Sequence, residues 1–218
     1  MDSEKEAYIK GIIEDIKKIE YIKSEDIPNI ELYMDQVTTF MDSRLAGFKR
    51  YDADKMLTKT MINNYTKNNL LPSPNKKKYS KDHMIILIFI YYMKSVMTIE
   101  DIHSLIEPLN DKYFGADSGV KFSDIYDEIF KLEETQAEVV ARDVIKNFER
   151  SKEAFAMLED GSEKEQLQMF ANICMLSFDV YMKKQLIEKM IEDNFSLKDK
   201  KEEKKKDKEK KDKKDKED

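Results

Sequence analysis

Apolar residues recur at spacings of three and four along most of this 218-residue chain, and this spacing constrains its fold more than any other feature. Only five Gly and four Pro interrupt the pattern, and the chain contains no Trp. An α-helix buries one face every 3.6 residues, so the spacing predicts a mainly α-helical protein with few, short strands. With 40% apolar residues, the chain is long enough for one sizeable core or two small domains.

The spacing predicts a series of helices separated by short polar connectors. Thr58, Ser80 and Thr98 stand at expected N-caps, because their side-chain oxygens can accept hydrogen bonds from the free N–H groups of a first turn. The expected elements are an amphipathic helix over about residues 3–23, a helix over 31–45, a short helix from Thr58 to Asn68, a turn over 73–78 whose flanks pair as a small β-wing, a buried helix from Ser80 to Met93, a helix from Thr98 to Pro108, a helix of about seven turns from Phe122, and a helix over 167–195. The helix over 167–195 is apolar on most sides, so we expect it either at the centre of a bundle or at a subunit interface.

Charge is distributed unevenly along the chain. Residues 55–94, called the lysine patch below, carry eight Lys and a single carboxylate, Asp82, whereas the whole chain has a net charge of -6. A local excess of seven positive charges in an acidic chain indicates a polyanionic partner. The residues from 198 to 218 are twelve Lys and nine acidic residues, and without apolar side chains we expect them to form a disordered, solubilising tail.

Within the lysine patch, the expected short helix and the turn combine the residue types that bind duplex DNA. Recognition of a duplex needs an element that enters the major groove, amide or cationic tips for base edges, and flanking cations for phosphates. The candidate DNA-binding residues are Thr58, Lys59, Thr60, Asn63, Asn64, Lys67, Lys76, Lys77 and Lys78. Asn63 and Asn64 are candidates for bidentate contacts to adenine, and the alternative interpretation of this pair is ordinary polarity on a helix surface.

The same segment resembles the winged helix-turn-helix of MerR-type regulators. The matching positions are Ile62 and Tyr65 in the recognition helix, residues 66–72 after it, Lys77 and Tyr79 in the wing, residues 80–82 at the next cap and residues 97–102 at the following turn. The resemblance implies a MerR-like winged helix-turn-helix, adds Tyr79 to the candidate DNA-binding residues, and implies double-stranded DNA as partner and a dimerising helix. Asn69 stands where that family has Gly, and Asn is the residue that best tolerates a left-handed helix end. Asn63 and Asn64 stand where it has Arg and Tyr.

The chain resembles a second family more closely, a domain of unknown function from Gram-positive bacteria. The stretches that carry this resemblance are IPNIELYMDQVTTFMDSRL and LTKTMINNYTKNNLLPSPNKKKYSKDH. No activity is implied by it.

Metal, cofactor and catalytic sites have no support in the sequence. Cys174 is the only cysteine, and His83 and His103 are twenty residues apart, so no Cys or His cluster is expected to bind a metal. A glycine-rich phosphate loop and a nucleophile with its base are also missing, so we expect neither an enzyme nor a cofactor, and no feature points to a small-molecule effector. The first residues lack a signal-peptide pattern and no apolar run has the length of a membrane span, so a cytoplasmic location without membrane contact is expected.

These observations predict four regions and one function. The regions are an N-terminal amphipathic helix over 1–30, a MerR-like winged helix-turn-helix domain over 31–110, a C-terminal helical bundle or dimerisation region over 120–197, and the charged tail over 198–218. The predicted function is that of a homodimeric, DNA-binding transcriptional regulator. The alternative is a helical protein-interaction module that has the winged-helix shape but does not bind DNA.

Overall fold

The computed structural model describes residues 2–18, 21–49, 51, 56–117 and 119–195, and it is mainly helical, as the apolar spacing predicts. The elements in chain order are α1 (Asp2–Lys17), η1 (Ser24–Asp26), β1 (Leu32–Tyr33), α2 (Met34–Arg44), η2 (Ala46–Phe48), α3 (Lys59–Lys67), β2 (Lys78–Tyr79), α4 (Lys81–Met93), α5 (Ile99–Tyr113), α6 (Phe122–Glu134), α7 (Gln136–Lys152) and α8 (Ser162–Phe195).

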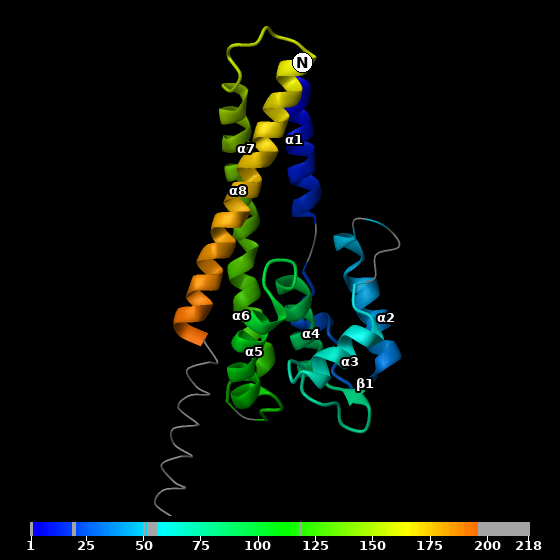
Figure 1. The fold of residues 1–218 in the computed structure, drawn as a ribbon. Coiled ribbons are helices and arrows are strands. Elements are labelled where there is room, and N and C mark those ends of the chain that lie inside the picture. Colours follow the sequence, from blue (N-terminus) through cyan, green and yellow to red (C-terminus); the bar gives the residue numbers. More distant parts are fainter. Residues whose placement is uncertain (1, 19–20, 50, 52–55, 118, 196–218) are drawn as a thin grey trace, which may run out of the picture.

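Figure 1 shows that these elements form two parts. The stalk consists of α1, α7 and α8, which run beside one another at one end of the molecule, with α7 in contact with both neighbours. The head consists of the elements from η1 to α6, gathered at the other end. The C-terminal half of α8 descends past the head, where it contacts α5.

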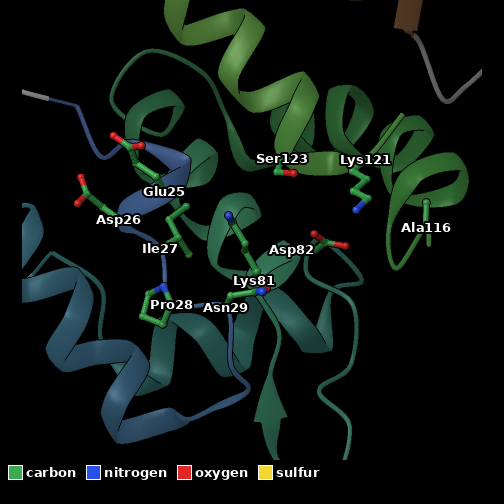
Figure 2. Close-up of a pocket in the computed structure, with 10 residues that line it drawn as sticks. All are labelled: Glu25, Asp26, Ile27, Pro28, Asn29, Lys81, Asp82, Ala116, Lys121 and Ser123. Atoms are coloured by element: carbon green, nitrogen blue, oxygen red, sulfur yellow. The ribbon is translucent and has the colours of Figure 1, made fainter. Parts of the chain in front are cut away.

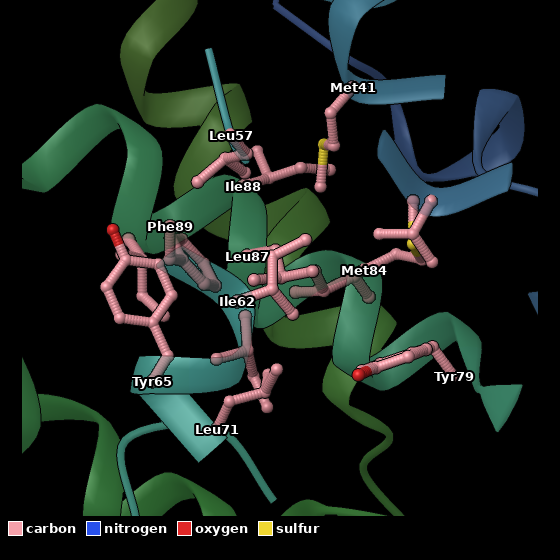
Figure 3. Close-up of a cluster of buried hydrophobic side chains, with 14 of the residues drawn as sticks. Met41, Leu57, Ile62, Tyr65, Leu71, Tyr79, Met84, Leu87, Ile88 and Phe89 are labelled. Carbon is pink, nitrogen blue, oxygen red and sulfur yellow. The ribbon is translucent and has the colours of Figure 1, made fainter. Parts of the chain in front are cut away.

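The head is built around α4, which is buried on every side. Its eight successive residues from His83 to Ile90 are all buried, which confirms the predicted buried helix after Ser80. Figure 3 shows side chains from α2, α3 and β2 converging on this helix. The resulting core contains 24 buried apolar residues, the first Ile22 and the last Tyr126, so it includes residues on both sides of the predicted domain over 31–110. Each such side chain contributes roughly 1.5–3 kcal/mol when it is removed from water.

The predicted β-wing is a tight turn whose strand pairs elsewhere. The two flanks of the turn share one bridge, between Asn75 and Lys78, whereas β2 pairs antiparallel with β1, with Leu32 opposite Tyr79. The sheet therefore connects the turn to the segment that leads into α2.

Several helix boundaries differ from the prediction. The first helix ends at Lys17 rather than near residue 23, and α2 begins only at Met34 because residues 32–33 pair in the sheet. The helix after Thr98 passes through Pro108 to Tyr113, since Leu109 and Tyr113 pack against the core beyond the proline. The predicted seven-turn helix from Phe122 is divided into α6 and α7 at Thr135.

The stalk has a small core, and the long helix α8 is largely exposed. Four buried residues hold the described part of the stalk together, namely Ile9, Ile13, Ala141 and Phe148. Within α8 only Asn172 and Ile191 are buried, so the predicted position at the centre of a bundle is wrong for the single chain. None of the helices in the described ranges is long and apolar enough to cross a membrane. The predicted disordered tail lies outside the described residues.

Candidate nucleic-acid interface

Helix α3 presents a polar face outward and an apolar face to the core. Its N-cap is Thr58, as predicted, whose Oγ1 accepts a hydrogen bond from the N–H of Met61 at 3.2 Å. Ile62 and Tyr65 are buried against α4, which fixes the rotation of the helix. Thr60, Asn63, Asn64 and Lys67 are therefore exposed, with both adjacent amides on the solvent side. The rotation that the sequence predicts for this helix is confirmed.

Asn69 ends α3 in the left-handed conformation, with φ of 58°. The N–H groups of Leu70 and Leu71 then donate to the carbonyl of Tyr65 at 2.9 and 3.2 Å. Both leucines are buried, so the left-handed residue redirects the chain from the polar helix into the core. This confirms the suitability of Asn at a position where MerR-type sequences have Gly.

The turn that follows, called the lysine turn below, consists of Asn75, Lys76, Lys77 and Lys78. Its central residues have φ of 48° and 65°, and the N–H of Lys78 donates to the carbonyl of Asn75 at 2.9 Å. Positive φ at both central positions defines a type I′ turn, which Asn-Gly adopts readily and which lysine adopts only against steric strain. Two exposed lysines are thus held at the tip of a strained turn.

Residues 33–35 bring the start of α3 and the lysine turn together. The Nζ of Lys59, in the first turn of α3, forms an ion pair with Asp35. The Nζ of Lys78 lies 5.5 Å from the ring centroid of Tyr33, within the range of a cation–π contact. Both lysines thus contact the short segment from Tyr33 to Asp35. Asp35 could not be identified from sequence, because it lies 24 residues before Lys59.

The remaining lysines of the lysine patch have other surroundings. Lys94 donates a hydrogen bond to the carbonyl of Met56 at 2.9 Å, and burial lowers the pKa of its ammonium group. Lys81 lies at the start of α4, where it lines a hollow of about 450 Å³ with Lys121 and three carboxylates (Figure 2). Lys55 lies outside the described residues. The surface formed by α3 and the lysine turn therefore has Lys59, Lys67, Lys76, Lys77 and Lys78.

The hollow in Figure 2 has mixed charge and is separate from this surface. The carboxylates of Glu25, Asp26 and Asp82 line it beside the two lysines. Asp82 also accepts a hydrogen bond from the N–H of Gly115 at 2.8 Å, so one of these carboxylates has a structural role in holding the loop after α5. Because both signs of charge are present, the hollow does not extend the cationic surface.

Tyr79 is buried in the core rather than exposed on the wing. Its side chain is 3% exposed and contacts the ring of His83 edge-on, with centroids 5.4 Å apart. Burial raises the pKa of its hydroxyl. The candidate role of Tyr79 in DNA contact is therefore incorrect. The alternation of a strand would have indicated this, since an outward Lys78 requires an inward Tyr79.

His83 completes the N-cap of α4. Its Nδ1 accepts a hydrogen bond from the N–H of Ser80 at 3.0 Å and lies 2.8 Å from the Ser80 Oγ. Burial lowers the pKa of the imidazole, which keeps Nδ1 free to accept this hydrogen bond. His103 lies on α5, and Cys174 is a free thiol on α8. Among the described residues, no three His, Cys, Asp or Glu side chains form a group that could hold a metal ion.

The head covers nearly the same residues as a known domain family. Residues 22–129 match the model of the family described as Domain of unknown function (DUF1836). The DUF1836 region includes all 24 core residues of the head and excludes α1, α7 and α8. The predicted resemblance to a domain family of unknown function is confirmed, while the likeness to MerR-type regulators stays a prediction. The chain matches no curated protein and no solved structure.

Proposed function

We propose that the head binds duplex DNA through the outer face of α3 and the lysine turn, and that the protein regulates transcription in this way. The observation that supports this most is the joining of the two elements at residues 33–35, where Lys59 pairs with Asp35 and Lys78 lies over Tyr33. A helix with exposed amides beside a cationic turn combines groups for base edges with groups for phosphates.

In the proposed complex, α3 lies in the major groove. Asn63 and Asn64 are exposed, and in this complex they face the base edges, where a side-chain amide can donate to N7 and accept from N6 of adenine. Lys76 and Lys77 contact phosphates from the tip of the turn, while Lys67 does so from the end of α3. Thr60 lies one residue after Lys59 on the exposed side, in position for a phosphate or a thymine methyl group. Thr58 uses its oxygen as the helix cap, so its role is to position α3.

Asp35 limits the affinity of this surface. Its carboxylate faces Lys59 and repels phosphates, so a phosphate contact by Lys59 requires the ion pair to open. Exposed ion pairs contribute about 0–1 kcal/mol, which makes the exchange energetically accessible. Asp35→Asn is therefore expected to tighten duplex binding severalfold, whereas Asp42→Asn on the same helix, whose carboxylate faces Lys49, is expected to change it little.

The direct test replaces the lysine turn without disturbing its fold. In Lys76→Asn/Lys77→Gly, the sequence Asn-Gly favours the type I′ turn and two charges are removed. We expect this variant to bind a 30-base-pair duplex at least tenfold more weakly than the wild type. The matched control, Lys146→Gln/Arg150→Gln, removes two exposed cations from α7 and should bind as the wild type does. Equal binding by both variants and the wild type would contradict the proposal.

A second candidate function is a protein-interaction module that uses the same surface. Tyr33 is 54% exposed beside Lys78, and an aromatic ring next to cations also fits an acidic protein. Selection of bound duplexes from a random library separates the two functions, because a DNA-binding regulator enriches a repeated sequence motif. Retention without sequence enrichment, abolished by moderate salt, would favour the protein-interaction module.

A further inference from the structure

The outer surface of α8 exposes an unusual amount of apolar side chain. Eight large apolar residues of this helix are each more than half exposed, namely Phe170, Ile173, Phe178, Val180, Tyr181, Met182, Leu186 and Met190. Together they present on the order of 1,000 Å² of apolar surface, given the size of such side chains. The largest apolar patch of a typical monomer is about 300–600 Å², and these eight side chains, which lie on more than one side of the helix, exceed that area in total.

Part of this surface forms a regular row. Every fourth residue from Phe170 to Met190 is apolar, and the apolar row, as we call it, consists of Phe170, Cys174, Phe178, Met182, Leu186 and Met190. All are exposed except Cys174, which is half-buried. Rows of residues four apart form the ridges that fit into the grooves of a second helix when helices pack. The apolar row therefore has the geometry of a helix-packing surface without a helix on it in the described part of the chain.

Neither residues 196–218 nor a lipid surface fits this row. Of residues 196–218, only Leu197 is apolar, so that segment has a single apolar side chain with which to cover the row. A helix that lies on a membrane carries an excess of Lys and Arg on its polar face. Helix α8 has four Lys and six carboxylates, which is unfavourable for an anionic lipid surface.

We propose that the apolar row packs against the same row of a second copy of this chain, with the two α8 helices antiparallel. A stable interface buries about 800 Å² on each partner, and the exposed side chains of the row would form its apolar centre, with the polar residues beside them at its rim. A two-fold axis between Phe178 and Met182 places the rows in self-complementary register. Phe178 then faces Met182 of the other copy close to the axis, and because the row winds around the helix by about 40° at each step, its outer members Phe170 and Met190 lie to the sides of the interface.

The antiparallel orientation follows from side-chain chemistry and charge. Close to the axis this orientation places the ring of Phe178 beside the sulfur of Met182, a favourable sulfur–aromatic pair, whereas a parallel pair in register would place Phe178 beside Phe178. Charges are also separated, because Lys183 comes level with Ser177 of the other copy, and Lys189 with Ala171. A parallel pair in register would instead place each charged residue beside its own copy, with Lys183 next to Lys183.

Sedimentation equilibrium of the full chain tests the proposal. We expect the wild type to be a dimer at micromolar concentration and Phe178→Glu/Met182→Glu to be a monomer, with the dimer dissociation constant raised at least a hundredfold. The matched control is Val180→Glu, because Val180 is equally exposed but points to the opposite side of the helix from its neighbours in the row. This variant should remain a dimer, and circular dichroism should show equal helix content in all three proteins.

Monomeric wild-type protein at about 100 μM would overturn the proposal, as would a dimer that survives Phe178→Glu/Met182→Glu. Binding of a monomeric wild type to vesicles of neutral or anionic lipid, lost in that variant, would assign the row to a membrane surface instead. The orientation is tested with Phe178→Cys and Met182→Cys, each also carrying Cys174→Ser. Mixed together, they should form more disulfide-linked dimer than either alone, and a higher yield from one variant alone would contradict the antiparallel pairing. The inference needs no DNA, so its outcome is independent of the proposed function.

Discussion

The head and the stalk differ in how they use their apolar residues. The head buries 24 of them around α4, whereas the core cluster in the described part of the stalk contains four, beside a long helix most of whose large apolar side chains face solvent. The head therefore has a core of its own, and its polar surface is available for a ligand. The stalk has more apolar surface than one chain covers, which is typical of an element that associates. The family match over residues 22–129 follows the same division.

The largest difference between head and stalk is expected when a buried side chain is truncated in each core. Leu87→Ala removes a fully buried side chain at the centre of the head, and we expect it to lower the free energy of unfolding by about 2–5 kcal/mol. Ile13→Ala opens a thin core that can collapse onto the gap, so we expect a loss at the low end of that range, about 2 kcal/mol. Urea denaturation followed by circular dichroism gives both values, and equal losses would contradict the difference between the cores.

The lysine turn should be a site where the head can gain stability. Lys76→Asn/Lys77→Gly relieves two positive φ angles and is expected to raise the free energy of unfolding by roughly 1–2 kcal/mol. Lys76→Gln/Lys77→Gln removes the same charges but keeps the strain, so it should leave stability near the wild-type value. Thermal denaturation of the two variants decides this, and a gain in both would attribute the effect to charge rather than to backbone.

Acid should weaken the head through His83. Burial lowers the pKa of His83 in the folded protein, so below about pH 6.5 the unfolded chain binds more protons and stability falls as the pH falls. This loss is at most about 1.4 kcal/mol per pH unit for one proton. In His83→Gln the side chain can still accept from Ser80, and the difference in unfolding free energy between pH 7 and pH 5.5 should shrink. In His103→Gln this difference should stay at the wild-type value. An undiminished difference in His83→Gln would show that protonation of His83 does not cause the loss of stability.

The smallest effect is expected in the stalk, at the ion pair between Lys17 and Glu138. The Nζ and Oε1 atoms are 2.9 Å apart, and this hydrogen bond lowers the pKa of Glu138. Both groups are in contact with water, so we expect Glu138→Gln to leave the melting temperature unchanged within error. A clear decrease in melting temperature would show that contacts between α1 and α7 matter more than their small core indicates.

Local features of the fold could be predicted from sequence, and long-range ones could not. The caps at Thr58, Ser80 and Thr98, the rotation of α3 and the left-handed Asn69 depend on residues within one or two turns. The pairing of β2 with β1 joins residues more than forty positions apart, and no local pattern specifies it.

The candidate site shows the same limit. Counting charge along the sequence located the lysine turn, but it missed Asp35 beside Lys59 and the hydrogen bond that holds Lys94 on Met56. The resemblance to MerR-type regulators placed Tyr79 on the DNA-binding surface, although the alternation of a strand turns this residue inward. For α8 the sequence left two positions open, the centre of a bundle and a subunit interface, because an apolar helix has the same residue pattern in both.

The dependence of duplex binding on salt tests most directly whether the head holds the DNA-binding surface. The logarithm of the binding constant falls linearly with the logarithm of salt concentration, with a slope of about -0.9 for each phosphate contact. We predict that Lys76→Asn/Lys77→Gly makes this slope shallower by about 1.8 per head, while Lys146→Gln/Arg150→Gln in the stalk leaves it unchanged. An unchanged slope in the head variant, or an equal change in both, would contradict the account.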